Sequence, residues 1–250
     1  RYQFGDTDDP WRCWECWWRP VAPPQPILSG SGTTDAQGNL LITLPADLKD
    51  AQGVPITDSV QLTIEATATG RDNQVISGRA TVVSHRGSMY LGLAPRAYVA
   101  QAGEAQSIDV VASDTAGQRQ PNQPIEVELV RYTWDNQFVA GANGGGQWEW
   151  RETRTSAGSQ QLTTDAKGEA VASFTPPEAG SYRVVARGRD SGGRVVESSI
   201  FLWVAGDGYA PWRRDNNDQI SLVSDKTSYR PGETAEVLIP SPFTQPHWAL

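Results

Sequence analysis

Two cysteines carry the most reactive side chains of this 250-residue chain, and they stand together as Cys13-Trp14-Glu15-Cys16. Four tryptophans surround or separate them: Trp11, Trp14, Trp17 and Trp18. One interpretation is a loop whose rings cover apolar surface of their own domain, with the two thiols bridged or free. Another is a contact patch for a second protein, because tryptophan is enriched at interaction hot spots.

Metal and redox chemistry are two further interpretations of the same pair. A zinc site needs four ligands, and nothing in the spacing brings His85 or His247 near the cysteines. A thioredoxin-like motif needs a strand, a loop and a helix, and prolines at positions 20, 23, 24 and 26 oppose a helix here. We therefore expect no metal at Cys13 and Cys16 and favour the first two interpretations.

Other catalytic patterns are missing from the sequence. His85 and His247 have no nucleophile and orienting acid at a readable spacing. Glu149 and Glu152 have opposite parity on a predicted strand and so lie on opposite faces. The acidic stretch 207–218 lacks the spaced ligands of a calcium loop, and no glycine-rich phosphate loop occurs. We predict no catalytic residue and no cofactor, and hence no enzyme.

The bulk composition limits the fold class and the partners. The net charge is −8 and the pI is near 4.8, which argues against nucleic acid because its binding proteins carry a basic surface. No run of 18 apolar residues exists, so no membrane span is expected. The 24 glycines and 17 prolines lie between short alternating segments, as is typical of an all-β chain.

A repeated turn organises these segments. Thr163-Thr164-Asp165-Ala166-Lys167-Gly168 repeats Thr33-Thr34-Asp35-Ala36-Gln37-Gly38 at an offset of 130 residues. In each copy the aspartate can accept hydrogen bonds from backbone amides two residues on, and the glycine can take a positive φ at the end of the turn. A repeat at fixed spacing indicates a repeated domain.

The repeat gives the domain boundaries. Residues 62–66 and 182–186 match at an offset of 120, so the first copy has ten extra residues, placed in its 47–58 loop. Residues 1–85 are predicted to be the C-terminal part of one β-sandwich, with the tryptophan- and cysteine-bearing excursion at 5–28. Residues 86–206 form a complete sandwich. Residues 207–219 are a linker, and residues 220–250 begin a third sandwich that stops early.

Seven short segments are predicted as strands of the complete sandwich, at the spacing of an immunoglobulin- or fibronectin-like fold. They are Tyr90–Leu93, Ser107–Ala112, Ile125–Tyr132, Gln147–Thr155, Ala170–Phe174, Ser181–Arg187 and Val195–Val204. The alternation places five side chains in the core: Ile125, Val127, Phe174, Tyr182 and Val184.

The third segment carries a resemblance to a known family. Ser224–Phe243, with Tyr229-Arg230-Pro231-Gly232-Glu233 followed by alternating Ala235, Val237 and Ile239, resembles a macroglobulin-like domain of the bacterial branch of the alpha-2-macroglobulin family. The Thr-Thr-Asp-Ala-x-Gly turns, Gly180–Val184 and Trp203–Gly206 fit the same modules. The resemblance implies tandem seven-stranded antiparallel sandwiches that lie against neighbouring macroglobulin-like domains of the same chain.

The resemblance also implies a function for the parent protein. Family members are exported or surface-anchored inhibitors, periplasmic, on the cell surface or secreted, that trap endopeptidases: a cut in a bait segment rearranges the domains, and a Cys-x-Glu-Gln thioester captures the protease. Cys13-Trp14-Glu15-Cys16 departs from that motif at its last position, so thioester chemistry is not transferred to it. Bait and thioester are expected beyond Leu250, which leaves this piece as extracytoplasmic scaffold with no reactive site of its own.

Two other classes stay open. One is a surface adhesin or stalk of immunoglobulin-like repeats, which a downstream bait and thioester domain would exclude. The other is an accessory carbohydrate-binding sandwich of a secreted enzyme, for which glycan binding by the Trp11–Trp18 segment would be the discriminating observation.

Overall fold

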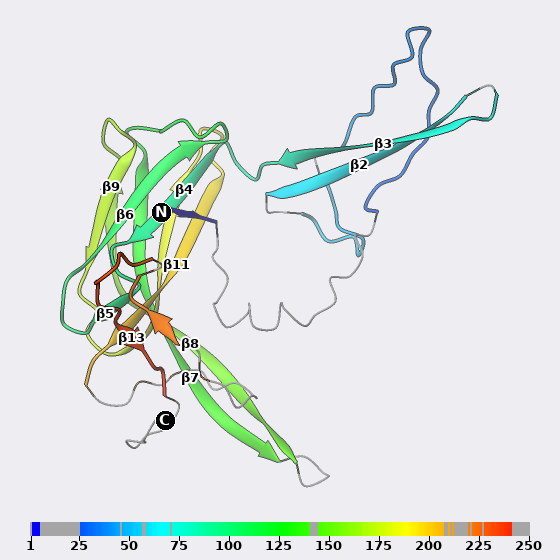
Figure 1. Cartoon of the computed structure of the whole chain (residues 1–250). Coiled ribbons are helices and arrows are strands. Elements are labelled where there is room, and N and C mark those ends of the chain that lie inside the picture. Colours follow the sequence, from blue (N-terminus) through cyan, green and yellow to red (C-terminus); the bar gives the residue numbers. More distant parts are fainter. Residues whose placement is uncertain are drawn as a thin grey trace. The chain divides into compact units, whose positions relative to one another are not determined.

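The regular elements of this computed structural model are β-strands (Figure 1), and no helix occurs among the described residues. The described residues are 2–5, 26–45, 47–56, 59–70, 72–140, 145–207, 210, 212, 220, 222–226 and 228–241. They contain no helix long and apolar enough to cross a membrane. The chain divides into two compact units, residues 1–14 with 88–250 and residues 15–87.

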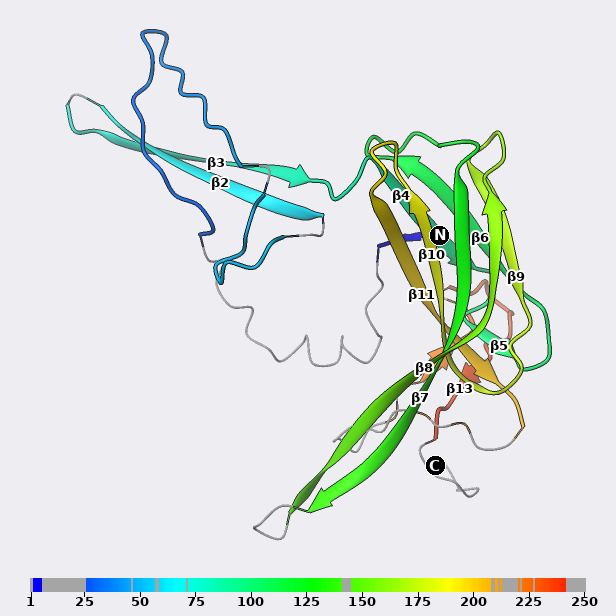
Figure 2. The same cartoon turned by 180° about the vertical axis from the view of Figure 1, so that it is seen from behind.

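The larger unit is built on a sandwich of two sheets (Figures 1 and 2). The first sheet runs, in spatial order, through β1 (Gln3–Phe4), β4 (Met89–Pro95), β6 (Gln106–Asp114) and β9 (Glu169–Phe174). The second runs through β5 (Val99–Gln101), β11 (Val195–Ala205), β10 (Gly180–Arg189), β7 (Pro124–Ala140) and β8 (Gly146–Thr163). All neighbours are antiparallel except β5 and β11.

The predicted all-β sandwich is confirmed, and each of the seven predicted segments overlaps a strand. The two sheets have four and five strands rather than seven in all. The additional strands are β1 and the three-residue β5, which are too short to give a recognisable alternation. The sequence repeat assigns residues 1–85 to the preceding module, whereas β1 pairs with β4. Such a short strand is placed by long-range pairing, which local sequence does not encode.

The core lies between the two sheets and follows the period-two alternation of their strands. The five side chains predicted to be core are confirmed as buried: Ile125, Val127, Phe174, Tyr182 and Val184. They pack with Leu91 and Leu93 of β4 and with Ile200, Leu202 and Val204 of β11 in one cluster.

Asp-x-x-Gly turns connect extended segments, as the repeat predicts. In the two repeated turns, the carboxylate oxygens of Asp35 and Asp165 each accept two backbone N–H bonds, 2.8–2.9 Å long. Gly38 and Gly168 have φ of 83° and 74°, which confirms the predicted positive φ. The same turn recurs at Asp50, Asp114 and Asp190, each with a positive-φ glycine three residues on.

Among its described residues, the smaller unit contains one long hairpin, β2 (Val60–Thr69) and β3 (Val75–Ser84). The ten-residue insertion predicted in the 47–58 loop contains the Asp50 turn and a bridge between Lys49 and Pro55. Residues after the sandwich form a short antiparallel pair of strands, β12 (Val223–Ser224) and β13 (Val237–Leu238).

Candidate functional site: the two ends of the sandwich

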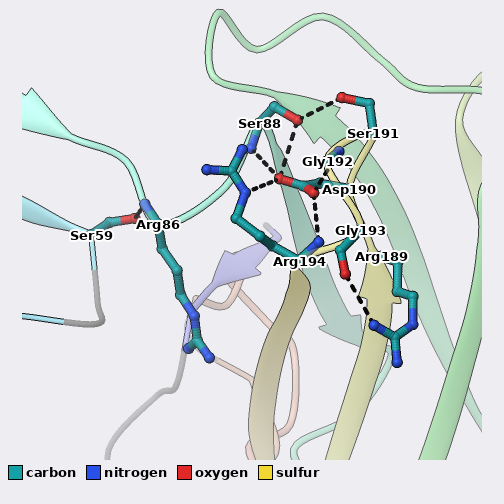
Figure 3. Close-up of polar contacts among 9 residues, drawn as sticks. All are labelled: Ser59, Arg86, Ser88, Arg189, Asp190, Ser191, Gly192, Gly193 and Arg194. Carbon is teal, nitrogen blue, oxygen red and sulfur yellow. Dashed lines mark hydrogen bonds and ion pairs between the residues drawn. The ribbon is translucent and has the colours of Figure 1, made fainter. Parts of the chain in front are cut away.

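The turn between β10 and β11 holds the start of the sandwich (Figure 3). Asp190 opens this turn because its Oδ1 can accept from Gly192 N and Arg194 N, both at 2.9 Å. Its Oδ2 accepts from Ser88 N at 2.9 Å and from Arg194 Nε at 2.9 Å, with Ser88 Oγ at 3.3 Å. One carboxylate thereby joins the first residue of the larger unit's sandwich segment to a turn 102 residues away.

The Asp190 carboxylate is buried, ionised and surrounded by hydrogen-bond donors. Its side chain has no exposed area. The Ser88 N–H is the largest cause that lowers the pKa of the Asp190 carboxyl to about 2; the Arg194 amide and charge and the Gly192 amide add to it, and burial opposes them. A carboxylate that is ionised and saturated with donors stabilises structure and is a poor proton acceptor for catalysis.

Figure 3 also shows two further hydrogen bonds, one in each unit. Arg189 Nη1 donates to the carbonyl of Gly193 at 3.0 Å, which braces the turn from its other side. In the smaller unit, the backbone N–H of Arg86 donates to Ser59 Oγ at 2.9 Å. That bond ties Arg86, the second residue after β3, to Ser59, the residue before β2.

The other end of the sandwich is held by apolar contacts. Trp203 of β11 packs against Trp212, with ring centroids 5.3 Å apart. A small cluster surrounds the two buried rings. It includes residues from the sandwich, from the segment after it, and from the β12–β13 pair: Val99, Ala179, Ala210, Val223 and Leu238. We call this set the tryptophan cluster. It joins the sandwich to the residues that follow it.

Backbone bonds reinforce the same end. Trp203 N donates to the carbonyl of Tyr98 at 3.0 Å, and Tyr98 N donates to the carbonyl of Asp225 at 3.2 Å. Asp225 is fixed in turn, because Tyr229 Oη donates to its carboxylate at 2.5 Å, and this bond is the largest cause that lowers its pKa. A shallow groove of about 540 Å³ lies beside these residues; it is lined by Tyr2, Gln3, Pro95, Arg96, Tyr98, Asp225 and Lys226.

A row of aromatic rings continues from the tryptophan cluster across the outer face of the second sheet. Centroids of neighbouring rings are 6.3 Å apart for Trp203 and Phe201, 6.1 Å for Phe201 and Tyr132, and 6.1 Å for Tyr132 and Trp134. The guanidinium of Arg183 lies 5.0 Å from the Phe201 ring centre and 5.9 Å from that of Tyr132. The part of this outer face next to the tryptophan cluster is therefore largely aromatic, whereas its other end carries the ion pairs of Arg187 with Glu128 and Glu197.

The candidate site residues of the sequence are not among the residues that the structure describes. Cys13, Cys16, Trp11, Trp14, Trp17 and Trp18 lie outside the described residues, so their disulfide, free-thiol and contact-patch interpretations stay predictions. Within the described part of the chain, no three His, Cys, Asp or Glu side chains gather as a metal site would require.

Sequence reasoning missed Asp190 and the tryptophan cluster. A signal for the cluster existed, because β11 is apolar at both parities: Ile200, Leu202 and Val204 point inward while Phe201 and Trp203 are also buried. A strand that is apolar on both faces is covered on both faces. For Asp190, the Asp-x-x-Gly pattern predicts the turn, but nothing local predicts its partner Ser88.

Known proteins resemble this chain. Residues 92–206 match the family model described as bacterial macroglobulin domain 6. An alpha-2-macroglobulin homolog of Nostoc sp. is 29% identical over 149 residues, which cover 58% of this chain and 8% of that protein. The alpha-2-macroglobulin of Escherichia coli is 26% identical over 155 residues, which cover 59% of this chain and 9% of that protein.

A solved structure agrees in fold. The cryo-EM structure of native E. coli alpha-2-macroglobulin matches with a TM-score of 0.53 at 19% identity, over 95% of this chain and 15% of that one. The chain spans less than a tenth of the length of the two curated relatives. The resemblance found in the sequence is confirmed: residues 92–206 match a bacterial macroglobulin domain, and the chain is similar to bacterial alpha-2-macroglobulins.

Proposed function

We propose that this chain is scaffold of an endopeptidase-trapping inhibitor and has no reactive site of its own. The proposal rests on one observation: the polar and aromatic groups at both ends of the sandwich make contacts within the chain itself. The Asp190 carboxylate accepts hydrogen bonds from Ser88 and from its own turn. The tryptophan cluster packs against the residues that follow the sandwich. Groups arranged in this way hold neighbouring segments in place and are not free to act on a substrate.

The trap itself is attributed to the longer parent protein. Support comes from the family and from the names of the relatives, alpha-2-macroglobulins of bacteria. A protease would be held when a bait segment is cut and the domains rearrange. A two-sheet sandwich offers no bistable element for such a change, so its role is to keep its shape. The expected compartment is outside the cytoplasm, and the expected partners are the neighbouring macroglobulin domains and, through the parent, endopeptidases.

The experiment titrates trypsin-like and elastase-like proteases against the 250-residue chain and against the full-length parent, with a large and a small substrate. The parent should block cleavage of the large substrate, because a cage excludes it, and the isolated chain should block neither. Deleting the bait of the parent should abolish inhibition. Stoichiometric inhibition by the 250-residue chain would place a reactive segment inside it and overturn the scaffold proposal.

A further inference from the structure

The β7–β8 hairpin extends well beyond the sandwich (Figures 1 and 2). The pairing of β10 with β7 ends at Ser181 and Tyr132, while β7 continues to pair with β8 over Thr133–Ala140 and Gly146–Thr153. Those eight residues of β7 span about 26 Å at ~3.3 Å per residue. We call this part of the hairpin the ribbon.

The ribbon has two faces of different chemistry. One face carries Trp134, Phe138 and Trp150, because Trp150 pairs with Asn136 across the ladder and so shares the parity of the other two. Glu152 pairs with Trp134 and lies at the sandwich end of the same face. The opposite face carries Thr133, Asp135, Gln137, Glu149 and Arg151, with Val139 near the end. The aromatic face is nearly buried at Trp134, 4% exposed, and opens to 41% exposure at Trp150 and 57% at Phe138.

A two-stranded ribbon with exposed aromatic side chains is an unfavourable structure in water. A hairpin needs a third strand or a packed neighbour to be stable, and exposed contiguous apolar surface marks a binding surface. Phe138 lies over Gly146, so closely that a Cβ at residue 146 would collide with its ring. Its ring therefore covers a glycine locally, while much of the surface of Phe138 and Trp150 stays exposed.

The aromatic face is continuous with an interface that already exists. The row of rings from Trp134 through Tyr132, Phe201 and Trp203 reaches Trp212 with neighbouring centroids 5.3–6.3 Å apart. At Trp203 and Trp212 this row is covered by Val223 of β12 and Leu238 of β13. The segment that begins at Ile220 therefore already covers one end of the aromatic row.

We propose that the aromatic face of the ribbon, defined by Trp134, Phe138 and Trp150, is the docking surface for the macroglobulin module that begins at Ile220. The module would extend its contact from the tryptophan cluster along the row of rings and out along the hairpin. This inference deepens the proposed scaffold role and rests on it: the hairpin is the arm that fixes one module against the next.

The test compares two pairs of substitutions in the full-length parent. Phe138→Ser with Trp150→Ser removes the two exposed rings of the aromatic face. Val139→Ser with Glu149→Ser changes the opposite face at neighbouring positions and is the matched control. Hydrogen exchange is followed in peptides of the ribbon and of residues 220–241, and peptides of β6 and β10 report whether the sandwich is folded.

The first pair should accelerate exchange at least tenfold in both the ribbon and residues 220–241, while β6 and β10 keep their protection. The control pair should leave residues 220–241 unchanged. Trp150→Phe alone should keep most of the protection of the original chain, because an aromatic ring remains at position 150. If the first pair unfolds the sandwich, Trp150→Ser alone is compared with Glu149→Ser in the same way.

Three results would overturn the proposal. Unchanged exchange in residues 220–241 would show that the module does not use this face. Protection of the ribbon that rises with protein concentration would assign the face to a second copy, and protection gained only on adding glycan would assign it to carbohydrate. Protease inhibition is measured in parallel, so a parent that shows the exchange pattern but inhibits nothing would refute the trap and leave the docking surface standing.

Discussion

The β2–β3 and β10–β11 hairpins are the same structure in two different environments. Every pair of the first ladder recurs 120 residues later: Val60 with Ser84 becomes Gly180 with Val204, and Thr69 with Val75 becomes Arg189 with Val195. Both hairpins turn through the same four-residue hydrogen-bonding pattern. Pairing and register are thus properties of the hairpin sequence itself.

Burial differs completely between the two. The inward face of β10–β11, with Tyr182, Val184 and Leu202, is fully buried against the other sheet. The equivalent residues Ile64 and Val82 in the smaller unit are exposed, although their face is as apolar and the opposite face is polar, with an ion pair between Glu65 and Arg79. Local sequence makes the hairpin, and only a facing sheet converts its apolar side into stability.

The largest expected contrast comes from truncating equivalent core positions. Leu202→Ala should cost about 2–5 kcal/mol because it leaves a cavity in packed surroundings. Val82→Ala, the matched change in the smaller unit, should cost less than about 0.5 kcal/mol because its side chain is exposed. Hydrogen exchange of the amides in each hairpin gives the two free energies separately. Equal costs would show that the burial difference is not real.

A smaller contrast is expected at the two repeated turns. Gly38→Ala should cost roughly 1 kcal/mol, the strain of a side chain at positive φ, since nothing lies within 4 Å of its Cβ position. Gly168→Ala should cost about 2 kcal/mol or more, because its Cβ would also lie 2.9 Å from Gln120 N and overpacking adds to strain. Urea unfolding measures the second, and local exchange the first; a larger cost at Gly38 would reverse this explanation.

The third prediction concerns pH and the turn that differs between the repeats. Asp190 takes the place of Gly70 in the earlier copy. Its folded pKa of about 2 lies below the ordinary 3.8, so its contribution to stability is full above about pH 4 to 5 and is lost as the pH falls towards 2.

Asp190→Asn should therefore flatten the acid side of the stability curve as well as lower stability at neutral pH, because an amide nitrogen cannot accept from Ser88 N. Thermal melts from pH 7 to pH 2 measure both effects. Parallel curves for the original chain and Asp190→Asn would contradict the assigned role, and Asp50→Asn at an exposed turn is the matched control.

The smallest contrast is between two arginines on the outer faces of the hairpins. Arg187 bonds Glu197 at 2.7 Å and Glu128 at 2.8 Å and is partly buried, so Arg187→Ala should cost about 0.5–1 kcal/mol. Arg79 makes one exposed pair with Glu65 at 2.7 Å, and Arg79→Ala should cost ~0.3 kcal/mol or less. Raising the salt concentration should shrink both effects, the second more completely; a salt-independent cost at Arg79 would mean that packing dominates.

The sequence predicts what is local and periodic. The turns at Gly38 and Gly168 follow from residue types within six positions, and the burial of Val184 follows from alternation along one strand. The strand positions of the complete sandwich follow in the same way, although β7 and β8 run further than their alternation indicated, because polar residues such as those at 135–137 are held by cross-strand pairing alone.

What could not be predicted depends on contacts between distant parts of the chain. The pairing of β1 with β4 and the bond from Ser88 to Asp190 join residues about 90 to 100 positions apart. Trp203 and Trp212 are near in sequence, yet their cluster needs Val223 and Leu238 from a different element. The Cys13 and Cys16 segment, the most chemically suggestive part of the sequence, is not among the described residues.

The course of β11 has a mechanical consequence. The strand begins beside the turn that clamps Ser88 and ends beside the residues that lead into the next module. Tension applied along the polypeptide would therefore run down the length of this strand, where its bonds to β10 on one side and β5 on the other lie across the load and must break together. Optical-trap pulling from Ser88 and Gly206 should accordingly give one abrupt rupture, whereas stepwise peeling at low force would contradict it. The domain behaves as a stiff strut that transmits displacement between its neighbours and absorbs little of it.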